Sequence, residues 1–352
     1  MSGEPEVIVR RDGALGVLTL NRPQAIGALT TNMCRLMTEA LLAWRDDPAV
    51  RAVLVDHAGE RGFCAGGDIR ALWDSAQVGG AAAREFFFTE YRLNHLMHGY
   101  AKPIVTVMDG IVMGGGVGLA WASTYRIATE RTTFAMPESG IGLFPDVGGG
   151  WHLPRLHGRT GRWLALTGAR IKAADCELLG IATDVAPSAM LARFKADLAR
   201  EPEAIETLLT EIEADAGHPP LADHRDAIDR LFEGPSVEAI VEALNADGSD
   251  WAQAQAKTMA TKSPLTMKVA LRQLDEGLKA KDFAENMAME MRIAARVVMS
   301  PDFSEGVRAV IIDKDNAPKW SPATLEGVAP AMLDAIFAPL PPDQEWSPLP
   351  GA

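Results

Sequence analysis

The sequence has little cysteine, and its three cysteines are far apart. Cys34, Cys64 and Cys176 form no CxxC pair, so neither a disulfide framework nor a zinc site is indicated. The histidines include no HExxH motif, and their one close pair, His95 and His98, has a spacing that is more often incidental than metal-binding. We therefore expect no metal site and a reducing compartment.

The chain also lacks long apolar runs and an excess of basic residues. No segment approaches the ~18 consecutive apolar residues that a membrane-spanning helix needs, and the first residues show no secretory pattern. The formal net charge of −13 disfavours binding to nucleic acid over most of the surface. These absences predict a cytoplasmic protein that binds neither a membrane nor a nucleic acid.

The motifs of several common enzyme classes are missing as well. The glycine run at 114–118 does not match GxGxxG, and the chain contains neither a Walker A sequence nor GxSxG. A nucleotide-binding fingerprint and a serine hydrolase are therefore not indicated.

What remains is the composition of a large globular enzyme. Of the 352 residues, 47% are hydrophobic and 23% are charged, which is ordinary for a packed protein. Strand-like segments alternate with helical ones along the first half of the chain, which favours an α/β architecture. We expect a core at 1–185, a helical insertion at 186–260, and a C-terminal helical region with a tail at 261–352.

The first elements can be predicted individually. Apolar runs on both sides of Asp12-Gly13 predict a hairpin that turns at this dipeptide. Apolar residues at helical spacing predict a helix from about Thr31 to Trp44, with Thr30 or Thr31 as its N-cap.

Glycines gather at two places that each follow a predicted strand, "AGGD" at 65–68 and "GGG" at 114–116. Glycine in a helix costs roughly 1 kcal/mol relative to alanine, so a bare backbone must be required there. Close packing is one explanation. The other is that the N–H groups of Gly67 and Gly115 converge on one oxygen as an oxyanion hole.

Two carboxylates, Glu138 and Asp146, interrupt the otherwise apolar and glycine-rich stretch "FAMPESGIGLFPDVGGGWHLPRL". An isolated acid in such a place more often has a structural role: Glu138 would cap a turn, and Asp146 would cap a helix beginning near Gly148. Alternatively, two carboxylates in different environments can divide acid and base work between them.

At this point the motifs carry a resemblance. "LNRPQAIGALT", "GFCAGGDIRAL", "KPIVTVMDGIVMGGGVGLA" and the stretch with the two acids resemble the enoyl-CoA hydratase/isomerase (crotonase) superfamily over about 5–185. Within it, "PESGIGLFPDVGG", "LTGARIKAADCELLGIAT" and "FSEGVRAVIIDKDNAPKW" are similar to the 3-hydroxyisobutyryl-CoA hydrolases. The resemblance implies a crotonase-like spiral of ββα units with additional C-terminal helices, and an acyl-CoA substrate without a cofactor, since coenzyme A is part of the substrate.

The resemblance also implies roles for individual residues. It places the oxyanion donors on the backbones of Gly67 and Gly115, the acid/base carboxylate on Glu138, and a substrate-contacting glutamate on Glu90. Asp146 matches the hydrolase pattern, because hydratases typically have glycine there. The other substrate contacts that we expect are Gly66, Asp68, Ile69 and Gly114.

One departure separates the branches of the superfamily. Hydratases carry a second glutamate in the helix after the glycine run, and that position is Gly118 here. We therefore expect hydrolysis of the thioester of 3-hydroxyisobutyryl-CoA, or of a similar short 3-hydroxyacyl-CoA, in valine catabolism. The alternatives are an enoyl-CoA hydratase or isomerase, displacement on an aromatic acyl-CoA, and a non-catalytic acyl-CoA-binding scaffold.

Coenzyme A is anionic, so an acidic chain must gather basic residues locally to bind it. The sequence offers Arg22, Arg61, Arg70 and Lys314 for its phosphates without choosing among them. The exact acyl chain and the oligomeric state are also left open, and a homo-oligomer is compatible with the sequence.

Overall fold

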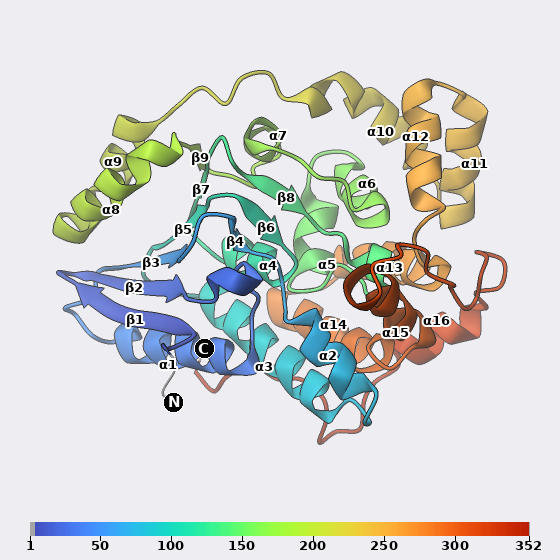
Figure 1. Cartoon of the computed structure of the whole chain (residues 1–352), viewed down its shortest axis with the longest axis horizontal. Helices are drawn as coiled ribbons and strands as arrows, with labels where there is room; N and C mark the ends of the chain where they lie inside the picture. The colour runs from blue at the N-terminus through green and yellow to red at the C-terminus, as the bar shows by residue number, and fades with distance from the viewer. Residues whose placement is uncertain (1–3, 352) are drawn as a thin grey trace.

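The computed structural model describes residues 4–351, and its centre is a six-stranded sheet with the strand order β1-β2-β3-β5-β7-β9 (Figure 1). Only β1 and β2 pair antiparallel, and the other neighbours in this sheet are parallel. The strands are β1 (Val7–Asp12), β2 (Leu15–Leu20), β3 (Ala52–His57), β5 (Ile104–Met108), β7 (Tyr125–Ala128) and β9 (Asp184–Val185).

A second sheet has three short parallel strands in the order β4-β6-β8. Each of them follows directly on a strand of the larger sheet, and the chain then enters a helical segment, which is the expected spiral of ββα units. The predicted fold class is confirmed. The elements are β4 (Gly62–Cys64), β6 (Ile111–Met113), β8 (Thr133–Ala135), α2 (Ile69–Ala76), α3 (Ala81–His98) and α4 (Gly115–Trp121).

The elements that the sequence predicted at the start of the chain are confirmed. Asp12 pairs with Leu15 across the hairpin turn, in which Gly13 has a positive φ of 58°. Helix α1 (Thr31–Arg45) begins after Thr30, whose side chain accepts a hydrogen bond from the N–H of Met33. This bond satisfies one of the free donors at the helix start.

Both faces of the large sheet are covered by helices. Residues of β3 such as Val53 and Val55 belong to the main apolar core on the side of α1 and α3, whereas Leu54 faces a second core with Phe194 of α8 and Leu209 of α9. The central strands β3 and β5 are therefore mostly apolar on both faces, as expected for a parallel sheet buried on both sides. The covering helices are α8 (Leu191–Arg200) and α9 (Ile205–Ile212).

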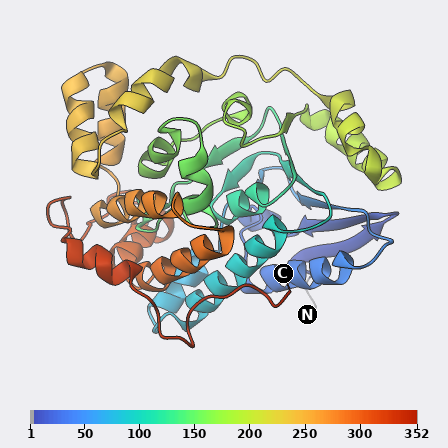
Figure 2. The ribbon, with the colours of Figure 1, turned by 180° about the vertical axis from the view of Figure 1, so that it is seen from behind.

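The helical segment at 186–260 packs in two separate places. Helices α8 and α9 lie on the sheet, and the stretch 213–219 has no regular structure (Figures 1 and 2). After this stretch, α10 and α12 pack against α6 (Thr160–Thr167). The segment thus has two packing partners within the core. Its later helices are α10 (Arg225–Leu231), α11 (Val237–Asp247) and α12 (Asp250–Met259).

The C-terminal helices cover the side of the core that carries residues 138–152. Helix α14 packs along α3, and α13 packs against α5 (Gly149–His152). Helix α15 packs against α2 and the 3₁₀ turn η2 (Glu138–Ile141). The tail then crosses α3 and ends beside α1, where the carbonyl of Gly351 accepts a hydrogen bond of 2.7 Å from Arg45 (Figure 2). The helices are α13 (Pro264–Gly277), α14 (Phe283–Val297), α15 (Pro301–Val307) and α16 (Pro330–Phe337).

Short elements complete the fold. Between β8 and β9 lie η2 (Glu138–Ile141), α5 (Gly149–His152), η3 (Leu153–Arg155), α6 (Thr160–Thr167) and α7 (Ala173–Leu178). Elsewhere lie the 3₁₀ turns η1 (Pro23–Ala25), η4 (Ser188–Met190), η5 (Pro202–Ala204) and η6 (Pro220–His224), and the π-helical turn η7 (Arg308–Ile312). Within residues 4–351, no helix is both long and apolar enough to cross a membrane.

Candidate active site

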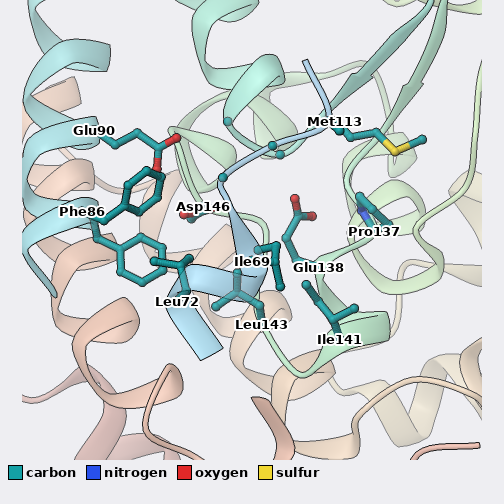
Figure 3. Close-up of a pocket in the computed structure, with 16 residues that line it drawn as sticks. Ile69, Leu72, Phe86, Glu90, Met113, Pro137, Glu138, Ile141, Leu143 and Asp146 are labelled. Atoms are coloured by element: carbon teal, nitrogen blue, oxygen red, sulfur yellow. The ribbon is translucent and has the colours of Figure 1, made fainter. Parts of the chain in front are cut away.

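A small cavity lies where the two glycine-rich loops, α3 and residues 137–146 meet (Figure 3). Its volume is about 60 Å³, which admits a few water molecules or a short chemical group. Its walls are mostly apolar and include three carboxylates. The lining residues are Ala65, Gly66, Gly67, Ile69, Leu72, Phe86, Phe87, Glu90, Met113, Gly114, Gly115, Pro137, Glu138, Ile141, Leu143 and Asp146.

The two glycine-rich loops approach each other backbone to backbone at one wall of the cavity. Gly66 has a φ of +110°, and a Cβ added to it would lie 3.7 Å from the backbone nitrogen of Gly115. Gly114 has a φ of +48°, and its Cβ would lie 3.2 Å from the Cα of Gly66. Both glycines adopt a positive φ that residues with side chains rarely adopt, and at Gly114 the added atom would also be tightly placed, which explains why glycine is required here.

The N–H groups of Gly67 and Gly115 are free at this wall. Neither donates a hydrogen bond to another group in the part of the chain that the structure describes. Gly115 is the first residue of α4, and the first N–H groups of a helix have no partner within it. Two unused amide donors in a mostly apolar cavity are the groups from which an oxyanion hole is built.

Glu138 is the first residue of η2 and is only 4% exposed. Its Oε2 has no hydrogen-bond partner among the described residues, so its side chain does not cap the turn. Burial, followed by the charge of Asp146, raises the pKa of Glu138 well above its ordinary value. Once ionised, such a carboxylate is a stronger base than a solvated one.

Asp146 lies in the loop before α5 and is also 4% exposed. Its Oδ2 accepts a hydrogen bond of 2.9 Å from the hydroxyl of Tyr91. It is not a helix cap, because the N-cap position of α5 is Gly148 and the only hydrogen bond that the Asp146 carboxylate makes within residues 4–351 is the one from Tyr91. Burial raises the pKa of Asp146 to about 7, against the opposing effect of the Tyr91 hydrogen bond.

Glu90 projects from α3 on the opposite side of the cavity from Glu138, with Asp146 between them in this view (Figure 3). It is 1% exposed, and its Oε1 has no partner in residues 4–351. A Cβ on Gly115 would lie only 2.4 Å from this oxygen, so Glu90 lies next to a free amide. Glu90 is thus a buried acid with an unused acceptor rather than a solvated helix residue.

The three carboxylates form one electrostatic unit. None of them has an ion-pair partner among the residues that the structure describes. Burial raises the pKa of Glu90 well above its ordinary value, and the charges of Asp146, Glu290 and Glu138 raise it further. Because like charges in an apolar site repel one another, each of these carboxyl groups is harder to ionise than a solvated acid. Such a site is suited to acid or base chemistry.

Gly118 lies one turn into α4, where neighbouring residues leave no space for a side chain. A Cβ on it would meet the Cβ of Val147 at 2.6 Å and the Nδ2 of Asn94 at 2.9 Å. A glutamate therefore has no room at this position without displacement of the loop that carries Asp146.

The other expected binding residues differ in whether they line the cavity. Gly66, Ile69 and Gly114 line the cavity, whereas the side chain of Asp68 is directed elsewhere. Asp68 caps α2 by accepting from the N–H of Ala71 and pairs with Arg22 at 2.9 Å. Asp68 as a substrate contact stays a prediction, and its carboxylate is already held by a helix cap and an ion pair.

The basic residues suggested for coenzyme A also differ from one another. Arg22 is engaged by Asp68 and by the carbonyl of Ala28, and Arg61 donates to the carbonyls of Pro23 and Gln24. Both arginines thus hold loops together. Arg70 and Lys314 are exposed and form no ion pair within the described chain, so they remain available to an anion.

Sequence reasoning did not find Tyr91 and Glu290. Tyr91 adjoins Glu90, but only the fold brings its hydroxyl to Asp146. Glu290 had a readable signal, because it occupies a position of the buried face of α14 where Met287, Ala294 and Val297 are apolar. An acid at such a position is rarely buried unless something pairs with it.

Comparison with known proteins agrees with the family resemblance seen in the sequence. The sequence model described as enoyl-CoA hydratase/isomerase matches residues 15–337. A Danio rerio protein named "3-hydroxyisobutyryl-CoA hydrolase, mitochondrial" is 45% identical over 95% of this chain and 90% of its own length.

Two solved structures are similar over nearly the whole chain. A carnitinyl-CoA dehydratase from Mycobacterium thermoresistibile has a TM-score of 0.92 at 41% identity and covers 97% of this chain and 98% of its own. An enoyl-CoA hydratase from Rhodobacter sphaeroides 2.4.1 has a TM-score of 0.90 at 37% identity, with coverage of 97% and 100%.

Proposed function

The chain belongs to the enoyl-CoA hydratase/isomerase family, and we propose that it hydrolyses the thioester of 3-hydroxyisobutyryl-CoA to the free acid and coenzyme A. The observation that carries the proposal is the cavity in which two amides without an acceptor adjoin three buried carboxylates without an ion-pair partner, as judged over residues 4–351. The relative from Danio rerio carries the name of this hydrolase. The reaction belongs to valine catabolism.

The free amides of Gly67 and Gly115 would polarise the thioester carbonyl. As the carbon is attacked, negative charge develops on the carbonyl oxygen, and two fixed donors stabilise it more in the transition state than in the ground state. Each donor of this kind is worth about 3 kcal/mol of barrier reduction. The amides and carboxylates supply the polarisation and the base, so the proposed reaction needs no metal or redox cofactor.

Glu138 is the proposed base or nucleophile. On one route its carboxylate attacks the carbonyl carbon, the C–S bond breaks, the thiolate of coenzyme A leaves and is protonated, and water then cleaves the resulting anhydride. On the other route Glu138 takes a proton from water and the hydroxide attacks the carbonyl carbon, after which the C–S bond breaks and the thiolate of coenzyme A leaves and is protonated. Asp146, held by Tyr91, would orient the water in both cases.

Hydroxylamine separates the two routes. An anhydride on Glu138 would be trapped as a hydroxamate on the peptide that contains this residue, whereas direct attack by water leaves the peptide unmodified. A single turnover in ¹⁸O-water tests the same point, because label in the Glu138 peptide requires an acyl-enzyme whose enzyme carbonyl is attacked by water. Absence of both signals would favour the direct route.

Gly118 favours hydrolysis over hydration of an enoyl-CoA. Both solved structures carry names of reactions other than thioester hydrolysis, so the local chemistry must decide. Hydratases use two glutamates of the protein to add water across the double bond of the substrate. At the position of the second glutamate this chain has Gly118, where there is no room for a side chain. An isomerase, which needs only one acid to move a proton, is the nearest alternative.

The size of the cavity supports a short acyl group. A volume of about 60 Å³ suits a branched group of a few carbon atoms better than a long chain. The free Oε1 of Glu90 offers an acceptor for a hydroxyl on that group. Coenzyme A itself would lie outside the cavity, and Arg70 and Lys314 are the proposed contacts for its phosphates.

One assay tests the function. The protein is incubated with 3-hydroxyisobutyryl-CoA and, separately, with crotonyl-CoA, while free thiol and enoyl absorbance are followed. We expect thiol release from the first substrate and no loss of enoyl absorbance from the second. Thiol release should be abolished by Glu138→Gln and strongly reduced by Asp146→Asn. If both variants release thiol at the wild-type rate, the proposed roles of these acids are wrong.

The cytoplasmic location stays a prediction, because the relative from Danio rerio is named as mitochondrial. The free thiols are compatible with either reducing compartment, since the three cysteines are buried and unpaired. Fractionation of the native cells, followed by detection of the protein, would place it.

A further inference from the structure

Glu290 is a fully buried acid that lies outside the cavity wall. It projects from α14 and is 0% exposed. Its helix belongs to the C-terminal region and packs along α3, the helix that carries Glu90 and Tyr91. A buried carboxylate is costly unless it is fully hydrogen-bonded, so its partners explain why it is there.

Four donors surround this carboxylate. The backbone N–H groups of Gly148 and Gly150 donate at 2.8 and 2.9 Å, the side-chain amide of Asn286 donates at 2.9 Å and that of Gln273 at 3.1 Å. All four partners are donors, and no ion pair to Glu290 occurs in residues 4–351. The ionised form suits this set of donors best, because a carboxylate has acceptor sites alone. Burial raises the pKa of Glu290 to about 7, and the hydrogen bonds from Gly148, Gly150 and Asn286 oppose that rise.

Gln273 and Glu290 together hold the segment that contains Asp146. Gln273 donates to the carbonyl of Pro145 at 2.7 Å as well as to Glu290, and Glu290 accepts from the N–H of Gly148. Asp146 and Val147 are the two residues between those attachment points. Both ends of the short segment are therefore fixed from α13 and α14.

The segment is strained, so it needs such fixing. Val147 has a φ of +52°, a conformation that β-branched residues rarely adopt and that costs of order 1–3 kcal/mol. Strain of this kind persists only where the surroundings over-determine the backbone. Without the bonds from Glu290, the turn at 145–148 would relax toward an ordinary conformation and carry the Asp146 carboxylate away from the cavity.

We propose that Glu290 is a positioning residue, whose carboxylate fixes the turn from Pro145 to Gly150 and thereby aims Asp146 into the cavity. The inference rests on the proposed function only in that it takes Asp146 to act on the substrate. It gives the C-terminal helices a part in the reaction, although none of their residues lines the cavity.

The test is Glu290→Gln in the full chain. The substitution keeps the shape of the side chain but replaces one oxygen by an NH₂ group, which must face N–H donors. We expect kcat for thiol release to fall about 10- to 100-fold, as for other groups that orient a reacting residue, while KM changes less than about threefold. A crystal structure of the variant should show Asp146 displaced and Glu138 in place.

A matched control separates positioning from general loss of stability. Asp175 is buried and accepts the N–H of Leu221 at 2.9 Å, away from the cavity. Asp175→Asn should lower the melting temperature and leave kcat unchanged. If Glu290→Gln does not fold, Gln273→Met removes the bonds to Pro145 and Glu290 from the other helix and should lower kcat in the same direction.

Non-additivity is the decisive readout. If Glu290 acts through Asp146, Glu290→Gln should lower kcat little further in a protein that already carries Asp146→Asn. An equal fold-loss in both backgrounds, or a Glu290→Gln structure with Asp146 unmoved, would overturn the proposal. If the wild-type protein releases no thiol, the proposed function is wrong. The displacement of Asp146 in the Glu290→Gln protein could still be measured in that case.

Discussion

The hydroxyl of Tyr91 lies 2.9 Å from the Oδ2 of Asp146, and both side chains are buried. A neutral donor that meets a carboxylate in an apolar site stabilises the charged form of that carboxylate. Tyr91 thus holds the direction of the Asp146 side chain and keeps the pKa of Asp146 lower than burial alone would set it.

Tyr91→Phe removes this hydrogen bond and changes almost nothing else. A hydrogen bond to a charged group is worth about 1.5–3 kcal/mol, so its loss should raise the pKa of Asp146 by on the order of one unit. Because Asp146 acts ionised in the proposed reaction, the pH at which kcat reaches half of its maximum should move upward. Activity lost at neutral pH should return at higher pH.

Tyr100→Phe is the control for that measurement. Tyr100 donates to the carbonyl of Leu41 at 2.7 Å, so its removal costs a hydrogen bond away from the cavity. Its pH–rate profile should overlay that of the wild type. A Tyr91→Phe profile that also overlays the wild type would show that Asp146 does not titrate in the rate-limiting step.

Gly118→Glu tests whether the glycine merely lacks an acid or also excludes one. The added Cβ would meet Val147 at 2.6 Å, so we expect a loss of about 3 kcal/mol or more in the free energy of unfolding. We also expect no hydration of crotonyl-CoA. Denaturant unfolding and enoyl absorbance measure the two effects.

Gly99→Ala provides the comparison for that substitution. Gly99 has an ordinary φ of −97°, and a Cβ on it would meet nothing closer than 3.8 Å. Its stability should be close to that of the wild type. A stable Gly118→Glu protein that hydrates crotonyl-CoA would contradict the proposal that Gly118 excludes the second glutamate of a hydratase.

Much of the fold was readable from the sequence because its signals are local. The Asp12-Gly13 turn, the Thr30 cap and the alternation of strands and helices each depend on neighbouring residues. What the sequence did not show is that residues 186–260 pack in two places, since α8 and α9 cover the sheet and α10 and α12 pack against α6. Packing partners are set by the whole fold and leave little local trace.

The candidate site divides in the same way. The glycines at 66–67 and 114–115 indicated that two backbones approach closely. The family resemblance identified Glu138, Asp146 and Glu90 as candidate site residues. Asp68 looked equivalent to its neighbours, but its short side chain reaches the start of α2 and Arg22 instead. Glu290 is 144 positions after Asp146 in the chain numbering, so only the packing of α14 reveals the connection.

Glu90 should determine the preference for a hydroxylated acyl group. Its free Oε1 offers the substrate hydroxyl an acceptor, and a site built for such a bond binds an analogue without the hydroxyl poorly. Glu90→Met removes the acceptor at similar length. The ratio of kcat/KM for 3-hydroxyisobutyryl-CoA over isobutyryl-CoA should fall by about 10- to 100-fold. An unchanged ratio would mean that Glu90 does not contact the hydroxyl.

Asp146→Asn should stabilise the fold in a pH-dependent way. The pKa of Asp146 is raised from 3.8 to about 7 in the folded protein. Between those values the unfolded chain has released a proton that the folded chain still holds, so the free energy of unfolding falls as pH rises. Asparagine stays neutral, and it resembles the protonated acid.

The melting temperatures of the two proteins should therefore be similar near pH 4 and should diverge by a few degrees at pH 8, with Asp146→Asn the more stable. Glu138→Gln should behave in the same direction, because burial raises the pKa of Glu138 well above its ordinary value. A difference in melting temperature that does not change with pH would mean that the carboxylate is solvated or paired in solution. The cavity would then be open to water, and an acid that is readily ionised at neutral pH would have no need of the Tyr91 hydrogen bond to keep its charge.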